Sequence, residues 1–165
     1  MATITLGGTP VETIGNLPEI GSKAPSFVLK TKDLSPISLA DFKGSQIVLN
    51  IFPSIDTEVC GNSVRNFNKK AASLNNTKVL CISRDLPFAH ARFCGAEGIE
   101  NVITGADLTG NFSKDYGLVF TTGAFEGLAS RSVIVLDETG TVVYTEQVPE
   151  TGDEPNYEAA IKALP

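Results

Sequence analysis

The residues most able to carry chemistry in this sequence are its three cysteines, Cys60, Cys81 and Cys94. They form no Cys-x-x-Cys pair, and His90 is the only histidine. The ligand spacing of a zinc site and the paired thiols of a disulfide oxidoreductase are therefore both missing, so we expect no bound metal. What remains is a choice between buried, inert thiols and a redox-active thiol.

Cys60 lies where a thiol can act as a nucleophile. The apolar run 47–52 ends at Pro53 and predicts a central strand that is covered on both faces. Apolar residues then recur at helical spacing from Cys60 onward, with Asp56 or Thr57 as the N-cap. The free N–H groups and the dipole of a helix N-terminus favour a thiolate at Cys60. Thr57 can aim its hydroxyl at this sulfur, and Pro53 can shield it from water. The alternative for Cys60 is a small buried apolar residue.

The other two cysteines differ in their surroundings. Cys81 lies within a second apolar run, 78–83, so we expect a structural thiol in a buried strand. Cys94 falls on a different helix, expected from Pro87 to about Gly95, and the local pattern alone leaves its role open. His90 on that helix is expected to be solvated.

The elements around these cysteines define the expected fold. Two short β-prone runs, Thr3–Leu6 and Val11–Ile14, flank Gly7-Gly8 and predict an N-terminal β-hairpin. Further strands are expected at 27–29, 47–52, 78–83, 101–104, 132–137 and 141–146, and helical segments at 38–42, 57–74, 87–95, 111–116 and 157–164. This order predicts an α/β fold with a central mixed sheet flanked by helices, compatible with a thioredoxin-like fold. Residues 1–165 are expected to form a single domain.

Composition narrows the possible partners and location. The chain carries a formal charge of −6 and has no basic run, which argues against nucleic acid and anionic membranes. Its apolar runs are far shorter than the roughly 20 residues that span a bilayer. The first residues, Met1–Leu6, lack the positive and apolar regions of a secretory signal. With an odd number of cysteines as well, we expect a cytoplasmic protein.

The sequence around Cys60 resembles a known family. Pro53, Thr57 and Cys60 form the string Pro-x-x-x-Thr-x-x-Cys, which is similar to the active-site signature of the peroxiredoxins. Further segments extend the likeness over nearly the whole chain, in the order found in the bacterial thiol peroxidase group of atypical two-cysteine peroxiredoxins. They are 21–27, 84–98, 129–137 and 154–160.

The resemblance implies a role for each candidate residue. Cys60 would attack the peroxide and become a sulfenic acid. Thr57 and Arg131 would hold the thiolate and polarise the O–O bond. Cys94 would be the resolving thiol that forms an intramolecular disulfide with Cys60, which requires local unwinding because the two lie on separate helices. Without the resemblance, Arg131 would be assigned to a surface salt bridge.

The resemblance also implies partners and excludes cofactors. The substrates would be hydrogen peroxide and organic hydroperoxides, and thioredoxin would be the reductant. The protein would be a homodimer without metal, haem or flavin. A non-catalytic thiol redox sensor or binding module is the alternative, and catalytic turnover would distinguish the two. Arg65 is a weaker candidate than Arg131 because it lies on another face of the Cys60 helix. Phe88 and Phe93 are expected in the core or at a dimer contact.

Overall fold

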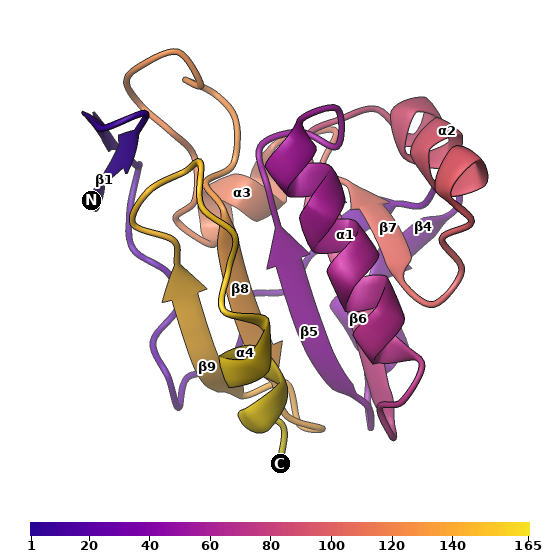
Figure 1. Ribbon diagram of the computed structural model, residues 1–165. Coiled ribbons are helices and arrows are strands. Elements are labelled where there is room, and N and C mark those ends of the chain that lie inside the picture. The colour runs from indigo at the N-terminus through magenta and orange to yellow at the C-terminus, as the bar shows by residue number, and fades with distance from the viewer.

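A seven-stranded sheet runs through the middle of the computed structural model, which describes residues 1–165 (Figure 1). In spatial order its strands are β4 (Pro36–Ser38), β3 (Val28–Lys30), β7 (Ile103–Ala106), β6 (Thr77–Ser83), β5 (Gln46–Ile51), β8 (Ser132–Leu136) and β9 (Val142–Gln147). β5 pairs parallel with β6 and antiparallel with β8, and β6 pairs parallel with β7. The expected mixed sheet is therefore confirmed.

Helices cover both faces of this sheet. Along β5 the side chains alternate, so that Val48 joins one core and Leu49 and Ile51 join the other. The Val48 face is covered by α1 (Glu58–Ala71), α2 (Pro87–Glu97) and α4 (Tyr157–Lys162). The Leu49 face is covered by α3 (Asn111–Asp115) and by the 3-10 helix η1 (Leu39–Phe42). In Figure 1, α1 and α4 lie in front of the sheet and α3 behind it. No helix has the length and apolar character needed to cross a membrane.

The N-terminal hairpin is present, but the connection between its two strands is shorter than expected. β1 (Thr3–Leu6) pairs with β2 (Thr9–Glu12), and Leu6 faces Thr9 across the turn. Gly7 and Gly8 both have positive φ angles, 59° and 82°, which a two-residue turn of this kind requires. The second strand therefore begins directly after the glycines, and its expected position at 11–14 was wrong by two residues.

Other boundaries also differ from the sequence expectations. β4 was not expected, because three residues beginning with proline carry almost no strand signal. β7 lies two residues later than expected. α2 continues past Gly95 and ends at Gly98, whose positive φ and N–H bond to the Cys94 carbonyl form a left-handed C-cap. Gly95 is thus an exposed residue inside the helix.

His90 is buried, and the expectation that it would be solvated was wrong. The side chain is 0% exposed because α2 turns this face toward the end of β6. Its Nε2 lies 2.8 Å from Ser83 Oγ, while Nδ1 has no hydrogen-bond partner. Burial lowers the pKa of His90, and the opposing influence of the Asp85 and Asp56 charges is smaller.

This burial predicts sensitivity to acid. The native state holds His90 neutral, whereas the unfolded chain binds a proton near the ordinary value of 6.5. The free energy of unfolding should therefore fall as the pH decreases below about 6.5, by up to about 1.4 kcal/mol per pH unit from this residue. Urea unfolding of wild type and His90→Gln between about pH 7.5 and pH 5 measures the difference. Equal pH slopes in the two proteins would contradict it.

Candidate active site

Cys60 lies in the first turn of α1, as expected. The chain leaves β5 through the buried Phe52 and Pro53, crosses a short loop and enters α1 with Thr57 at the N-cap position. Cys60 is 1% exposed. Its sulfur is thus almost enclosed and lies close to the positive end of the helix dipole, which favours the thiolate.

Arg131 is the positive group that meets this sulfur. It immediately precedes β8 and is 2% exposed, and its Nη2 donates to Cys60 Sγ at 3.4 Å. Nε and Nη2 also donate to the Thr151 carbonyl oxygen, at 3.2 and 3.1 Å. No carboxylate forms an ion pair with Arg131, and its Nη1 is buried without a partner. A buried guanidinium requires compensation of its charge, and Cys60 is the only ionisable side chain that contacts it directly.

Thr57 is oriented differently from the expectation. Its hydroxyl donates to the Ser54 carbonyl oxygen at 3.0 Å, and the structure records no hydrogen bond between Thr57 and the Cys60 sulfur. The Thr57 side chain also makes no N-cap hydrogen bond to α1. Since the hydroxyl proton is already donated, the oxygen keeps its lone pairs free to accept a hydrogen bond. Pro53, two residues after the end of β5, is buried.

A buried polar cluster connects the first turn of α1, which carries Cys60, to the sheet. The sequence analysis did not predict it. Ser63 Oγ donates to the Cys60 carbonyl oxygen at 2.7 Å. Asn50 on β5 donates to Ser63 Oγ at 3.1 Å and lies 3.6 Å from Cys81 Sγ. Both Asn50 and Ser63 are fully buried. A lone asparagine inside the apolar run 47–52 was the signal that could have revealed this cluster.

A second cluster fixes the loop before α1, and it was also missed. Asp85 accepts hydrogen bonds from Ser54 Oγ at 2.8 Å and from the Ile55 backbone N–H at 2.7 Å. The Ser83 hydroxyl also donates to Asp85, so it must accept from His90 Nε2–H. These bonds join the loop that leads to Cys60 to the start of the helix that carries Cys94.

Cys94 and Cys81 are free, buried thiols. Cys94 lies on α2 and is 4% exposed, and burial raises its pKa despite the opposing charge of Lys32. Cys81 on β6 is fully enclosed, and burial raises its pKa to about 12 although the Asn50 hydrogen bond acts in the other direction. Both thiols are therefore protonated near neutral pH. The expected burial of Cys81 is confirmed.

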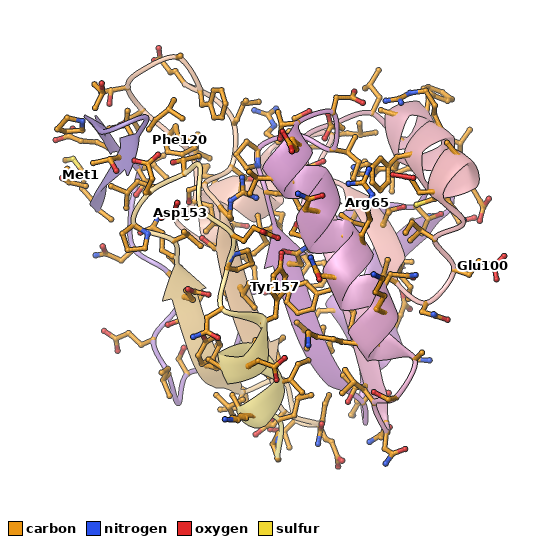
Figure 2. All side chains as sticks on the ribbon, in the orientation of Figure 1. Met1, Arg65, Glu100, Phe120, Asp153 and Tyr157 are labelled. Atoms are coloured by element: carbon orange, nitrogen blue, oxygen red, sulfur yellow. The ribbon has the colours of Figure 1, made fainter.

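Two surface ion pairs connect α2 to α1 and to the loop before α1. Arg65 on α1 pairs with Glu97, and Arg92 on α2 pairs with Asp56 in the loop before α1. The Arg65 guanidinium also lies over the Phe93 ring, 5.2 Å from its centroid. Figure 2 shows Arg65 on the side of α1 that faces α2. Arg65 thus serves the contact between the helices, and its lower rank as a partner of the Cys60 sulfur agrees with this position.

Comparison with known proteins identifies the family. Residues 19–161 match the family model described as Redoxin. The chain therefore belongs to the redoxin family. It is 51% identical over 164 residues to thiol peroxidases of Mycobacterium tuberculosis and Corynebacterium glutamicum, covering 99% of both chains in each comparison. The resemblance to the thiol peroxidase group of the peroxiredoxins is confirmed.

Solved structures of redoxin proteins share the fold. A peroxiredoxin-like protein from Aquifex aeolicus superposes with a TM-score of 0.93 at 36% identity, covering 99% of this chain and 96% of that one. A thiol peroxidase from Chromobacterium violaceum gives a TM-score of 0.90 at 24% identity, covering 98% and 95% of the two chains, and this supports the fold alone. The thioredoxin-like fold expected from the order of elements is confirmed.

The contact between Arg131 and Cys60 predicts the effect of its removal. Arg131→Met should slow alkylation of Cys60 by iodoacetamide near neutral pH by roughly ten- to hundredfold. The reason is that a hydrogen bond to a charged group contributes about 1.5–3 kcal/mol. The rate is followed by mass spectrometry of the labelled Cys60 peptide. Arg65→Met removes the same charge from α1 itself and should change the rate by less than about twofold. Equal slowing in both variants would contradict a specific role for Arg131.

Proposed function

We propose that this protein, a thiol-dependent peroxidase, reduces hydrogen peroxide and organic hydroperoxides with Cys60 as its nucleophile. The observation that carries this proposal is the contact of Arg131 with the Cys60 sulfur. The guanidinium is buried and has no carboxylate partner, so its charge favours the thiolate. The family relationship supports the same assignment.

In the first step, the Cys60 thiolate attacks the terminal oxygen of the hydroperoxide. A sulfur–oxygen bond forms and the O–O bond breaks, and its electron pair leaves with the second oxygen. That oxygen takes up a proton and departs as water or an alcohol. Cys60 is oxidised to a sulfenic acid, and the peroxide is reduced by two electrons.

Two groups assist this step. Arg131 Nη1 is a buried donor without a partner, so it is free to donate to an oxygen on which negative charge develops. The Thr57 oxygen, whose proton is donated to Ser54, can accept a hydrogen bond from the peroxide hydroxyl. Together they hold the O–O bond between a donor and an acceptor beside the sulfur. Pro53 excludes water from the same pocket.

In the second step, Cys94 resolves the sulfenic acid. The Cys94 sulfur attacks Cys60, an S–S bond forms, and the hydroxyl of the sulfenic acid leaves as water after taking up a proton. The Cys94 thiol is buried on α2 and its pKa is raised, so it cannot react in the closed structure. The start of α1 and part of α2 must therefore unwind, which breaks the Arg65–Glu97 and Arg92–Asp56 ion pairs.

Further proposals concern the partners. A dithiol protein such as thioredoxin would reduce the disulfide, and thiols then account for every electron without a metal, haem or flavin. A cytoplasmic location fits this need for a reducing supply.

A homodimer would cover Leu86 and Phe88, which are 57% and 65% exposed at the start of α2. Sedimentation velocity should then show dimers for wild type and a shift toward monomer for Phe88→Ser.

A coupled peroxidase assay tests the assigned thiols. With thioredoxin, thioredoxin reductase and hydrogen peroxide, Cys60→Ser should consume no peroxide. Cys94→Ser should consume a single equivalent per chain and then stop, although dithiothreitol should restore turnover by reducing the sulfenic acid directly. Cys81→Ser serves as the matched control and should keep most of its turnover. A wild type that is oxidised once and not recycled would instead indicate a redox sensor, and loss of turnover in folded Cys81→Ser would move the resolving role to Cys81.

The unwinding of α2 can be tested at Gly95. An added Cβ there meets no atom within 4 Å, so Gly95→Ala should stabilise α2 by up to about 1 kcal/mol. Stopped-flow measurement should show disulfide formation slowed by up to about fivefold while the first reaction with peroxide is unchanged. Ala96→Gly is the opposite change at an exposed neighbour and should accelerate the second phase. Equal second phases in all three proteins would confine the unwinding to α1.

Gly61→Ala is a less suitable test of this unwinding. A Cβ at Gly61 would lie 3.2 Å from Phe93 Cε2 on α2. The substitution therefore changes the contact between the two helices as well as helix propensity.

A further inference from the structure

The orientation of Arg131 depends on a segment without regular structure. Two of its nitrogens donate to the Thr151 carbonyl oxygen, and this carbonyl follows β9 in residues 149–152. A carbonyl in such a segment can hold a buried guanidinium in place only if the segment is itself fixed. The groups that fix residues 149–152 therefore bear on the position of the charge beside Cys60.

The N-terminal hairpin provides the backbone partners of this segment. Thr5 N donates to the Pro149 carbonyl oxygen at 2.8 Å. In return, Thr151 N and Thr151 Oγ1 both donate to the Thr5 carbonyl oxygen at 2.8 Å. A strand from the start of the chain is thus hydrogen-bonded to the residue whose carbonyl holds Arg131.

The Glu150 side chain accepts hydrogen bonds both from the hairpin and from its own segment. Its carboxylate accepts from Gly7 N at 2.8 Å and Gly8 N at 3.1 Å, and also from the Thr5 hydroxyl. On its own segment it accepts from Gly152 N at 3.1 Å. These hydrogen bonds lower the pKa of Glu150 to about 2, so the carboxylate is charged at neutral pH. One side chain therefore ties the turn of the hairpin to the residues on either side of Thr151.

We infer that Glu150 is a positioning residue, which holds the Thr151 carbonyl in place through the hairpin and thereby keeps the Arg131 guanidinium against Cys60. This inference rests on the proposed function, which assigns the stabilisation of the Cys60 thiolate to Arg131. It gives the N-terminal hairpin, which contributes no side chain to the sulfur, a part in the reaction.

The hairpin does not need Glu150 in order to fold. Ile4 and Val11 form a separate apolar cluster with Phe120, which Figure 2 shows beside the hairpin. Backbone bonds from Ile14 N to Val119 O and from Thr121 N to Glu12 O add a second attachment. Loss of the Glu150 carboxylate should therefore loosen residues 149–152 while the hairpin stays in place.

Glu150→Gln tests this inference. It should slow both the alkylation of Cys60 and the single-turnover reaction with peroxide by about fivefold, the effect of one lost hydrogen bond. The pH at which alkylation reaches half its maximal rate should move upward, which a merely structural role would not produce. Asp153→Asn removes the same charge three residues away, where the side chain makes no hydrogen bond, and should change neither rate. Thr5→Val should reproduce part of the loss, and Thr5→Ser should restore it.

A double-mutant cycle shows whether Glu150 acts through Arg131. In the Arg131→Met background, adding Glu150→Gln should slow alkylation no further. A further fivefold loss in that background would overturn the inference, as would an unchanged profile in Glu150→Gln alone. If Arg131→Met itself leaves alkylation and peroxide reduction unchanged, it is the proposed role of Arg131 that fails. Circular dichroism of each variant confirms that the fold is retained.

Discussion

The structure depends most on a buried positive charge that has no carboxylate beside it. Arg131 is held inside the protein by the Thr151 carbonyl and by the Cys60 sulfur. An unpaired guanidinium in such a place is unfavourable unless acceptors compensate it, and the Thr151 carbonyl oxygen and the Cys60 sulfur are the acceptors that contact it. The start of β8, the first turn of α1 and the segment after β9 must therefore be held close together, because each provides one of the three contacting residues. The two polar clusters described above hold the first turn of α1 to the sheet and the loop before α1 to Asp85.

The proposed mechanism requires the first turn of α1 and part of α2 to unwind, and the contacts of the two helices differ in kind. Beneath Cys60, Ser63 and Asn50 make enclosed hydrogen bonds, whose loss leaves buried polar atoms unsatisfied. At the surface, α2 is closed by the Arg65–Glu97 and Arg92–Asp56 pairs, which water can replace at small cost. These contacts favour an opening in which α2 moves more readily and α1 beyond its first turn stays anchored to the sheet.

Sequence patterns predicted those strands, helices and turns that depend on residues close together in the chain. The apolar run of β5, the helical spacing from Cys60 and the two-glycine turn were all recognised, although the second hairpin strand was misplaced. The sequence could not show that His90 is buried or that Glu150 reaches the first hairpin, because those contacts join residues far apart in the chain. Nor could the sequence show that the Asp85 carboxylate accepts from Ser54 and Ile55, which lie 31 and 30 positions earlier in the chain. Arg131 was identified through family resemblance, and its burial became evident only in the structure.

In the proposed mechanism, the surroundings of the two sulfurs set the order of the two chemical steps. In the closed structure Cys60 faces a guanidinium, whereas the burial of Cys94 favours its neutral thiol. In the proposed mechanism only Cys60 is therefore prepared to react before α2 opens, and it would meet the peroxide first. If α2 opens as proposed, water would reach Cys94 and its pKa would return toward the ordinary value, so the same motion that brings Cys94 to Cys60 would also activate it. In the proposed mechanism, oxidation of Cys60 would also remove the nucleophilic sulfur that contacts Arg131, which would weaken the closed arrangement at the moment when opening is required.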